Sequence, residues 1–356
     1  MVQYSRMNNR AKKTLVRLGV ACLFVIFPLM RSEADGLHEE AVRYRDEGYR
    51  LQRSGDLKGA LQAYQKSAAI DTSDPVLDYY FGLYYQQAGD LKAAQDAFAQ
   101  ALVLNPNYPE ALWSVARLHQ QLGNKEQALY HWLKLGMIYE QHGDHQRAQQ
   151  AYQQVLELDP NYLEANNHLA LVEERLGHAG DASLHWMKTG LLEEQRGEFE
   201  AARQAYQRVV VLNPTAVEAQ SNLALLEERL GHREAALQQW LRLAQLYDQQ
   251  GQLDAAKRTY ERILNMNPDS VDALSNLAIL HERSGNRDQA ILYWSKCQQL
   301  AGPDDPRTQR AAERLMALGA LKTGPAYHKH VVQQELEAQH QSLDEFRAAT
   351  DSQPQR

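Results

Sequence analysis

Cysteine is nearly absent from the 356-residue sequence, which has only Cys22 and Cys297. Cys22 lies in an apolar segment near the N-terminus, and if that segment is removed, the remaining cysteine cannot form a disulfide within the chain. Proline is scarce, with 11 residues, and β-branched residues are few beyond the first 35 positions. These absences predict a soluble all-α protein whose fold is stabilised by packing alone.

Signatures of catalysis are also missing. The sequence has no glycine-rich phosphate loop, nucleophile elbow or paired metal-binding motif. His328 and His330 flank a lysine and make a poor metal site. We therefore expect no enzyme activity, no cofactor and no metal, unless another chain supplies a catalytic domain.

The N-terminus has the features of a secretory signal peptide. Basic residues precede the apolar run Leu18–Met30, and Ser32-Glu33-Ala34 fits a cleavage site. Residues 1–34 are therefore predicted to be cleaved after Ala34, which implies export to the periplasm or cell envelope of a bacterium. An uncleaved anchor is the alternative, although the run is short for a bilayer span. Lipidation of Cys22 is disfavoured because most of the apolar run follows this residue.

The charge balance bears on partners. Cleavage would remove six basic residues and one acidic residue, so the formal net charge would change from −7 to −12. Such an acidic chain is unsuited to nucleic acid and to anionic lipid surfaces. Membrane association is expected only through an uncleaved N-terminal segment, if at all.

Two internal periods run through the rest of the chain. In residues 38–108, glycine, alanine and aromatic residues recur 34 positions apart, as Gly48 and Gly82 do. Over residues 109–302 the period is 54, in five parallel series of proline, glycine, tryptophan and tyrosine. This predicts two short repeats followed by about three and a half modules of 54 residues.

Glycines divide each module into three predicted helices, at 109–122, 124–142 and 144–158 in the first module. Gly123 and Gly143 fit left-handed helix ends, and the residues that follow them, Asn124 and Asp144, fit helix caps. His178 and His232 replace Asn124 in later modules and are expected to cap in the same way. His145 is predicted to be a partly buried packing residue, because Phe199 and Leu253 occupy its position elsewhere.

The segment Tyr79–Pro106 resembles the tetratricopeptide repeat family, and so does the W-x2-L-G-x2-Y spacing of Trp132, Leu135, Gly136 and Tyr139. The resemblance implies a right-handed α-solenoid of antiparallel helices. A module of 54 residues equals one 34-residue repeat plus 20, so two repeats would overlap by 14 residues. The middle helix of each module would then belong to both.

The middle helix is predicted to be continuous over about 18 residues rather than bent at Gly136. Gly190 keeps this glycine, but the third module has Ala244, which offers no turn geometry. A small residue here would instead allow close approach of a neighbouring helix. Beyond the array, residues 303–321 are predicted to form a capping helix, and residues 322–356 a polar helix or tail.

Seven aromatic residues in the apolar register are predicted to be core residues. They are Trp132, Trp186, Trp240 and Trp294, together with Tyr152, Tyr206 and Tyr260. Alanine precedes each tryptophan by four residues, which is typical of packing between helices. A ligand platform is the alternative for the tryptophans.

Two groups of residues are candidates for partner binding. Tyr79, Tyr80, Tyr84 and Tyr85 cover more than one face of a single helix, so some should be exposed and available for recognition; packing in the core is the alternative. The second group faces the groove in the family that the chain resembles, and comprises Asn222, Asn276, Arg175, Arg229 and Arg283. The alternative is a solvated face of Glu–Arg salt bridges along the stack. Acidic residues at position two of these helices, such as Glu110, argue against binding of acidic C-terminal tails.

The resemblance implies a non-catalytic scaffold that binds a protein or peptide along the solenoid. Envelope biogenesis, secretion and polysaccharide export are possible settings. Self-assembly into a homo-oligomer is the alternative, because solenoids with incomplete caps can stack end to end.

Overall fold

The computed structural model describes residues 36–320, and every secondary-structure element in this range is an α-helix. The predicted all-α class is therefore confirmed. The predicted signal peptide and the predicted polar helix or tail at 322–356 lie outside the described residues. None of the described helices is both long enough and apolar enough to cross a membrane.

The chain divides into two compact blocks, one ending at Gly177 and the other beginning at His178. In the N-terminal block, a helix at residues 36–54 precedes the others. These are α2 (Leu57–Ile70), α3 (Pro75–Ala88), α4 (Leu91–Leu104), α5 (Pro109–Gln121), α6 (Lys125–Gln141), α7 (His145–Leu158) and α8 (Leu163–Leu176).

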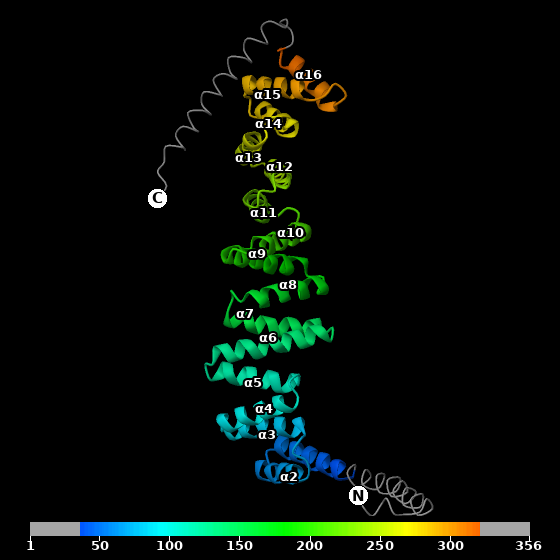
Figure 1. Cartoon of the computed structure of the whole chain (residues 1–356), viewed down its shortest axis with the longest axis vertical. Coiled ribbons are helices and arrows are strands. Elements are labelled where there is room, and N and C mark those ends of the chain that lie inside the picture. Colours follow the sequence, from blue (N-terminus) through cyan, green and yellow to red (C-terminus); the bar gives the residue numbers. More distant parts are fainter. Residues whose placement is uncertain (1–35, 321–356) are drawn as a thin grey trace, which may run out of the picture. The chain divides into compact units, whose positions relative to one another are not determined.

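The C-terminal block continues the series. It contains α9 (Ala179–Arg196), α10 (Phe199–Leu212), α11 (Val217–Arg229), α12 (Arg233–Gln249), α13 (Leu253–Met266), α14 (Val271–Arg283), α15 (Arg287–Leu300) and α16 (Pro306–Ala317). Within each block, every helix from α2 onward packs against the next one along the chain (Figure 1). Short connections make neighbours antiparallel, and the arrangement is an all-α helical-repeat solenoid.

Helix ends follow the predicted glycine pattern, but not all the predicted caps form. Gly123 and Gly143 have φ angles of 76° and 75°, which places both in the left-handed region. Asp144 caps α7 by accepting from the Arg147 backbone N–H. Asn124 makes no such bond, since its amide lies 3.4 Å from the His119 ring instead.

The expectation that His178 and His232 cap helices is wrong. Both occupy the N-cap position, but neither side chain accepts a capping hydrogen bond. The His232 ring is engaged with the preceding helix, because its Nδ1 lies 2.8 Å from the Glu227 carboxylate.

The middle helix of each module is continuous, as predicted. α6, α9 and α12 have 17, 18 and 17 residues, and each passes through the small-residue position without a break. A Cβ atom on Gly136 would lie 2.5 Å from the Tyr152 ring, and one on Gly190 would lie 2.5 Å from the Tyr206 ring. At these two positions glycine therefore allows close helix approach and does not mark a bend.

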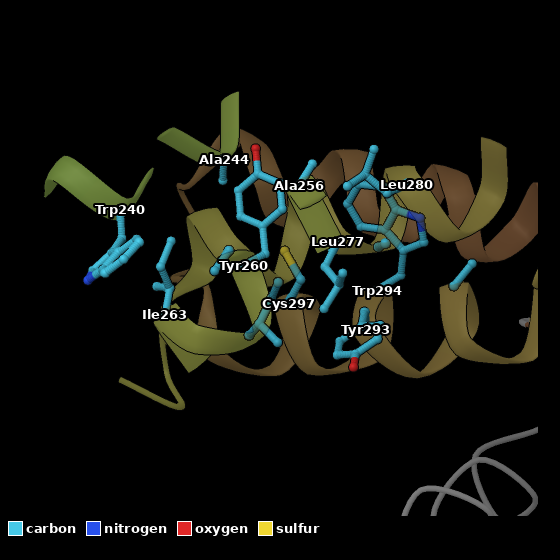
Figure 2. Packing of buried hydrophobic residues seen from close by; sticks show 14 of the residues in the cluster. Trp240, Ala244, Ala256, Tyr260, Ile263, Leu277, Leu280, Tyr293, Trp294 and Cys297 are labelled. Atoms are coloured by element: carbon cyan, nitrogen blue, oxygen red, sulfur yellow. The ribbon is translucent and has the colours of Figure 1, made fainter. Parts of the chain in front are cut away.

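The seven predicted core aromatics are buried. Each exposes at most 8% of its surface, and Trp294, Tyr152 and Tyr206 expose none. Figure 2 shows Tyr260 near Ala244, and Trp294 with Leu277, Leu280 and Cys297, in a cluster that extends from α11 to α16. Large rings beside small residues let helices pack at native density without voids.

The predicted capping helix completes the fourth module. α16 packs against α15 and buries Ala311 and Leu315, so it takes the place of a third helix. α15 has 14 residues, fewer than the other middle helices. Pro303 follows its end, and proline cannot continue a helix.

Substituting Gly136→Ala should destabilise the protein by about 1–3 kcal/mol, because the added methyl group must displace Tyr152. Gly180→Ala is the matched control. Gly180 also lies in a helix, but no atom lies within 4 Å of the place that its Cβ would take, so alanine should stabilise by up to about 1 kcal/mol. Urea unfolding of both variants checks the pair, and equal effects would contradict a close approach at Gly136.

A stacked histidine pair makes stability depend on pH. The rings of His119 and His131 lie 5.6 Å apart, and burial, with smaller contributions from the charges of His119 and Lys134, lowers the pKa of His131 from 6.5 to about 4. The folded state therefore resists protonation of a group that the unfolded chain protonates near its ordinary pKa.

The free energy of unfolding should fall as the pH drops from about 6.5 to about 4, because only the unfolded state takes up this proton. Partial solvent access limits the expected loss to about 1–2 kcal/mol. His131→Gln, which introduces the residue found at the equivalent Gln239, should flatten the profile. Denaturant unfolding between pH 4 and 7.5 is the measurement, and an unchanged profile in the variant would contradict the assignment.

Candidate functional site

One position recurs near the end of successive repeat helices, at alternating spacings of 34 and 20 residues once the modules begin. It carries glutamine in the first three helices, namely Gln52, Gln86 and Gln120. It carries an acid in the next six, namely Glu140, Glu174, Glu194, Glu228, Asp248 and Glu282. The change from amide to carboxylate divides the chain into two chemically different stretches.

Most of these acids pair with an arginine 32 to 35 residues later, two helices further along the stack. The ion pairs are Glu140–Arg175 (3.0 Å), Glu194–Arg229 (4.0 Å), Glu228–Arg262 (2.8 Å), Asp248–Arg283 and Glu282–Arg314. The intervening helix adds a hydrogen bond from an aromatic side chain. The Tyr152 hydroxyl donates to Glu140 (2.9 Å), and Trp240 Nε1 donates to Glu228 (3.2 Å). One carboxylate thus connects three helices.

Three of the five predicted groove-facing residues are in these pairs. Arg175, Arg229 and Arg283 are about half exposed, but each meets a carboxylate of its own block. This arrangement is the salt-bridged face that was the alternative interpretation. Asn222 hydrogen-bonds to the Tyr206 hydroxyl, and Asn276 is partly buried on α14.

In the first three helices of this series, glutamines stand where the later helices carry these ion pairs. Gln52 Nε2 donates to Gln87 Oε1 at 3.3 Å. By the same register, Gln86 corresponds to Gln121, and Gln120 to Gln154. The aromatic hydrogen bonds persist, since Tyr64 donates to Gln52 (2.7 Å) and Trp132 to Gln120 (3.4 Å).

Two hollows open where the ion pairs are missing. The larger one, of about 800 Å³, lies between α5 and α7 with α6 as its floor. Its lining includes Gln86, Trp113, Arg117, Gln120, Gln121, Trp132, Leu135, Tyr139, Arg147, Gln150, Gln153 and Gln154. The second hollow, of about 440 Å³, is lined by Tyr49, Gln52, Arg53, Leu83, Gln86 and Gln87. Because Gln86 lines both, we call the two hollows together the glutamine groove.

Trp113 and Arg117 form the exposed wall of the larger hollow. The Arg117 guanidinium lies 4.6 Å from the centre of the Trp113 ring, and 43% of Trp113 is exposed. The edge of this ring meets Trp132, with centroids 6.3 Å apart. The positions equivalent to Trp113 carry Asn or Ser, and those equivalent to Arg117 carry Leu or Ile. The pair is therefore specific to the first module.

Sequence analysis missed this pair. Its signal was present, because Trp113 is the one tryptophan of the sequence outside the 54-residue series. A search for regularity passes over a residue that breaks the pattern. A tryptophan at a position where the other modules carry Asn or Ser is the sequence feature that indicates this pair.

The groove is positively charged in an acidic chain. Arg53 lies over the Tyr49 ring (6.0 Å) and Arg117 over Trp113, and within residues 36–320 neither has a carboxylate partner. Arg147 lies over Tyr139 (5.1 Å) and also pairs with Asp144 (2.7 Å). No acidic residue lines either hollow among the described residues.

The four tyrosines proposed for recognition are less accessible than expected. None is exposed, since Tyr79, Tyr80, Tyr84 and Tyr85 are all partly buried and pack against core clusters. Tyr80 stacks on Tyr49 with centroids 4.5 Å apart. Neighbouring helices on both sides of α3 cover these rings, which explains why several faces of one helix can be aromatic. Their role in partner binding stays a prediction.

Family comparisons identify tetratricopeptide repeats in both blocks. Profiles described as tetratricopeptide repeat match residues 79–135, 130–162 and 237–280, and one described as TPR repeat matches residues 190–231. The matches at 79–135 and 130–162 share residues 130–135, which lie in α6. No curated protein matches the sequence significantly.

Solved structures of similar chains are repeat proteins at low identity. A crystal structure of MamA protein covers 60% of this chain and 95% of its own, at 20% identity and a TM-score of 0.25. The P58(IPK) TPR domain covers 80% and 100%, at 15% identity and a TM-score of 0.26. A tetratricopeptide repeat protein from Parabacteroides merdae covers 79% and 99%, at 17% identity and a TM-score of 0.25.

The family profiles match within each of the two compact blocks, and each block has a helix contact made close by a glycine, at Gly136 and Gly190. The chain is a tetratricopeptide repeat protein.

Proposed function

We propose that the protein is a non-catalytic interaction scaffold that binds an extended segment of a partner protein in the glutamine groove. The observation that carries this proposal is that glutamines replace both the acids and the arginines of these pairs in the first three helices of the series. Solenoids present long surfaces for partners, and here one stretch of that surface is left open by its own side chains.

In the third module, an arginine fills the space that is equivalent to the larger hollow. The Arg262 guanidinium lies 4.4 Å from the centre of the Trp240 ring and pairs with Glu228. The side chain therefore covers the indole and bridges α11 to α13. In the first module, Gln154 and Gln120 stand in these positions around Trp132. Neither is charged, and a hollow lies over the indole instead.

The chemistry of the groove suits a peptide main chain. Each glutamine amide offers both a donor and an acceptor, which matches the alternating N–H and C=O groups of an extended segment. Trp113 and Tyr139 supply rigid contact area at low entropic cost. The lining residues come from the 36–54 helix and from α3, α5, α6 and α7, so a bound segment would cross several helices.

The location of this scaffold is part of the proposal. The basic N-terminal region, the apolar run Leu18–Met30 and the small residues before Asp35 support export to a bacterial envelope. Envelope biogenesis, secretion and polysaccharide export are processes that such a scaffold would serve.

The double variant Gln120→Glu/Gln154→Arg should close the larger hollow with the pair that the third module already uses. Tagged full-length protein would be used to recover partners from native envelope extract, with quantitative mass spectrometry. We expect the closed variant to recover at least about tenfold less of each partner than the unmodified protein does, because the introduced guanidinium would occupy the partner's place over Trp132. The midpoint of thermal unfolding should not fall.

Glu228→Gln/Arg262→Gln is the matched control, since it exchanges the same residue types in the opposite direction and also leaves the net charge unchanged. It should recover the same partners as the unmodified protein. Equal recovery by the closed variant would show that the glutamine groove is not the binding surface.

A further inference from the structure

We infer that the partner segment is acidic, and that two of its side-chain carboxylates bind Arg53 and Arg117, one in each hollow. The inference rests on the proposed function and specifies the chemistry of the ligand. It concerns an internal stretch of a partner chain and not a chain terminus.

Both arginines are positioned by an aromatic ring and keep hydrogen-bond donors available for a ligand. Each guanidinium lies against an aromatic ring, Arg53 over Tyr49 and Arg117 over Trp113. Such stacking occupies a face of the planar group and leaves the N–H donors along its edge available. Within residues 36–320 no carboxylate meets either edge, whereas Arg175, Arg262 and Arg283 are each paired.

Charge complementarity selects an anionic occupant. The sequence as a whole is acidic, with a formal net charge of −7. The groove departs from that balance, because its lining contains arginines and no acid among the described residues. A lysine or arginine of a partner would meet like charge and no carboxylate, whereas an Asp or Glu side chain could form bidentate hydrogen bonds with a guanidinium.

The groove extends on both sides of Arg117. Gln86 and the second hollow continue it in one direction, and Gln150 and Gln154 of α7 continue it in the other. A segment bound along this course would place one acid at Arg117 and another at Arg53, with residues between them against Leu83 and Trp113. A chain terminus would leave one of these directions unfilled.

Selection from a random 12-residue peptide display library tests the inference, with full-length protein as bait. Enriched sequences should carry at least two Asp or Glu residues, together with an apolar or aromatic residue. A selected peptide, made synthetically, should bind at least about tenfold more tightly than its twin with Asn for Asp and Gln for Glu. Fluorescence anisotropy at low and high salt provides the affinities.

Single variants locate the carboxylates. Arg117→Gln and Arg53→Gln should each weaken binding of the acidic peptide about five- to tenfold and leave binding of its amide twin unchanged. Arg262→Gln is the control, because it removes the same charge from a paired arginine of the C-terminal block, and its effect should stay within twofold. Oligo-uronate and oligo(dT) competitors test other polyanions, which should displace the peptide weakly.

The results separate the two proposals. Enrichment of neutral or basic peptides that the Gln120→Glu/Gln154→Arg variant no longer binds would overturn the acidic ligand but support the groove. Acidic peptides that bind Arg117→Gln and Arg53→Gln as well as they bind the unmodified protein would overturn the inference, and so would failure to enrich any peptide. Tighter binding of oligo-uronate than of any peptide would replace the partner class.

Discussion

The structure depends on contacts between a small residue on one helix and a buried ring on the next. Where Gly136 meets Tyr152, the helices come close enough for the Tyr152 hydroxyl to reach Glu140. That carboxylate then accepts from Arg175 of the following helix. Close packing therefore places the polar groups, and the polar groups in turn connect three helices. Each exposed ion pair contributes under about 1 kcal/mol, so the apolar contact is the larger stabilising term.

The same scaffold has two chemical forms. In the C-terminal block, Arg262 of the protein itself fills the space over the Trp240 ring. In the N-terminal block the equivalent residues are glutamines, and the space is open. Burial of the indole does not require the arginine, because Trp132 is buried at least as fully as Trp240. Repetition supplies the fold, and departure from repetition supplies the candidate site.

Periodicity predicted most of the fold but not the site. The 54-residue register located the helices, the glycine helix ends and the core aromatics, because these follow from local sequence and burial. Two features were not accessible. The acidic partners of Arg175 and Arg283 lie 35 residues earlier, on another helix. The sequence also places a glutamate directly beside each arginine, so it does not show which acid forms the ion pair. The covering of Tyr79 and Tyr80 depends on neighbouring helices that a single helical pattern does not place.

The Gln52–Gln87 hydrogen bond gives the first helices an insensitivity to salt that the ion-paired helices lack. Hydrogen bonds between neutral amides do not weaken as dissolved ions accumulate, whereas exposed ion pairs are screened. High ionic strength would therefore weaken the ion pairs of Glu194 and Asp248, whereas the hydrogen bonds of Gln52 would persist. The surface around Gln52 would therefore keep its geometry while the ionic strength of the surroundings changed.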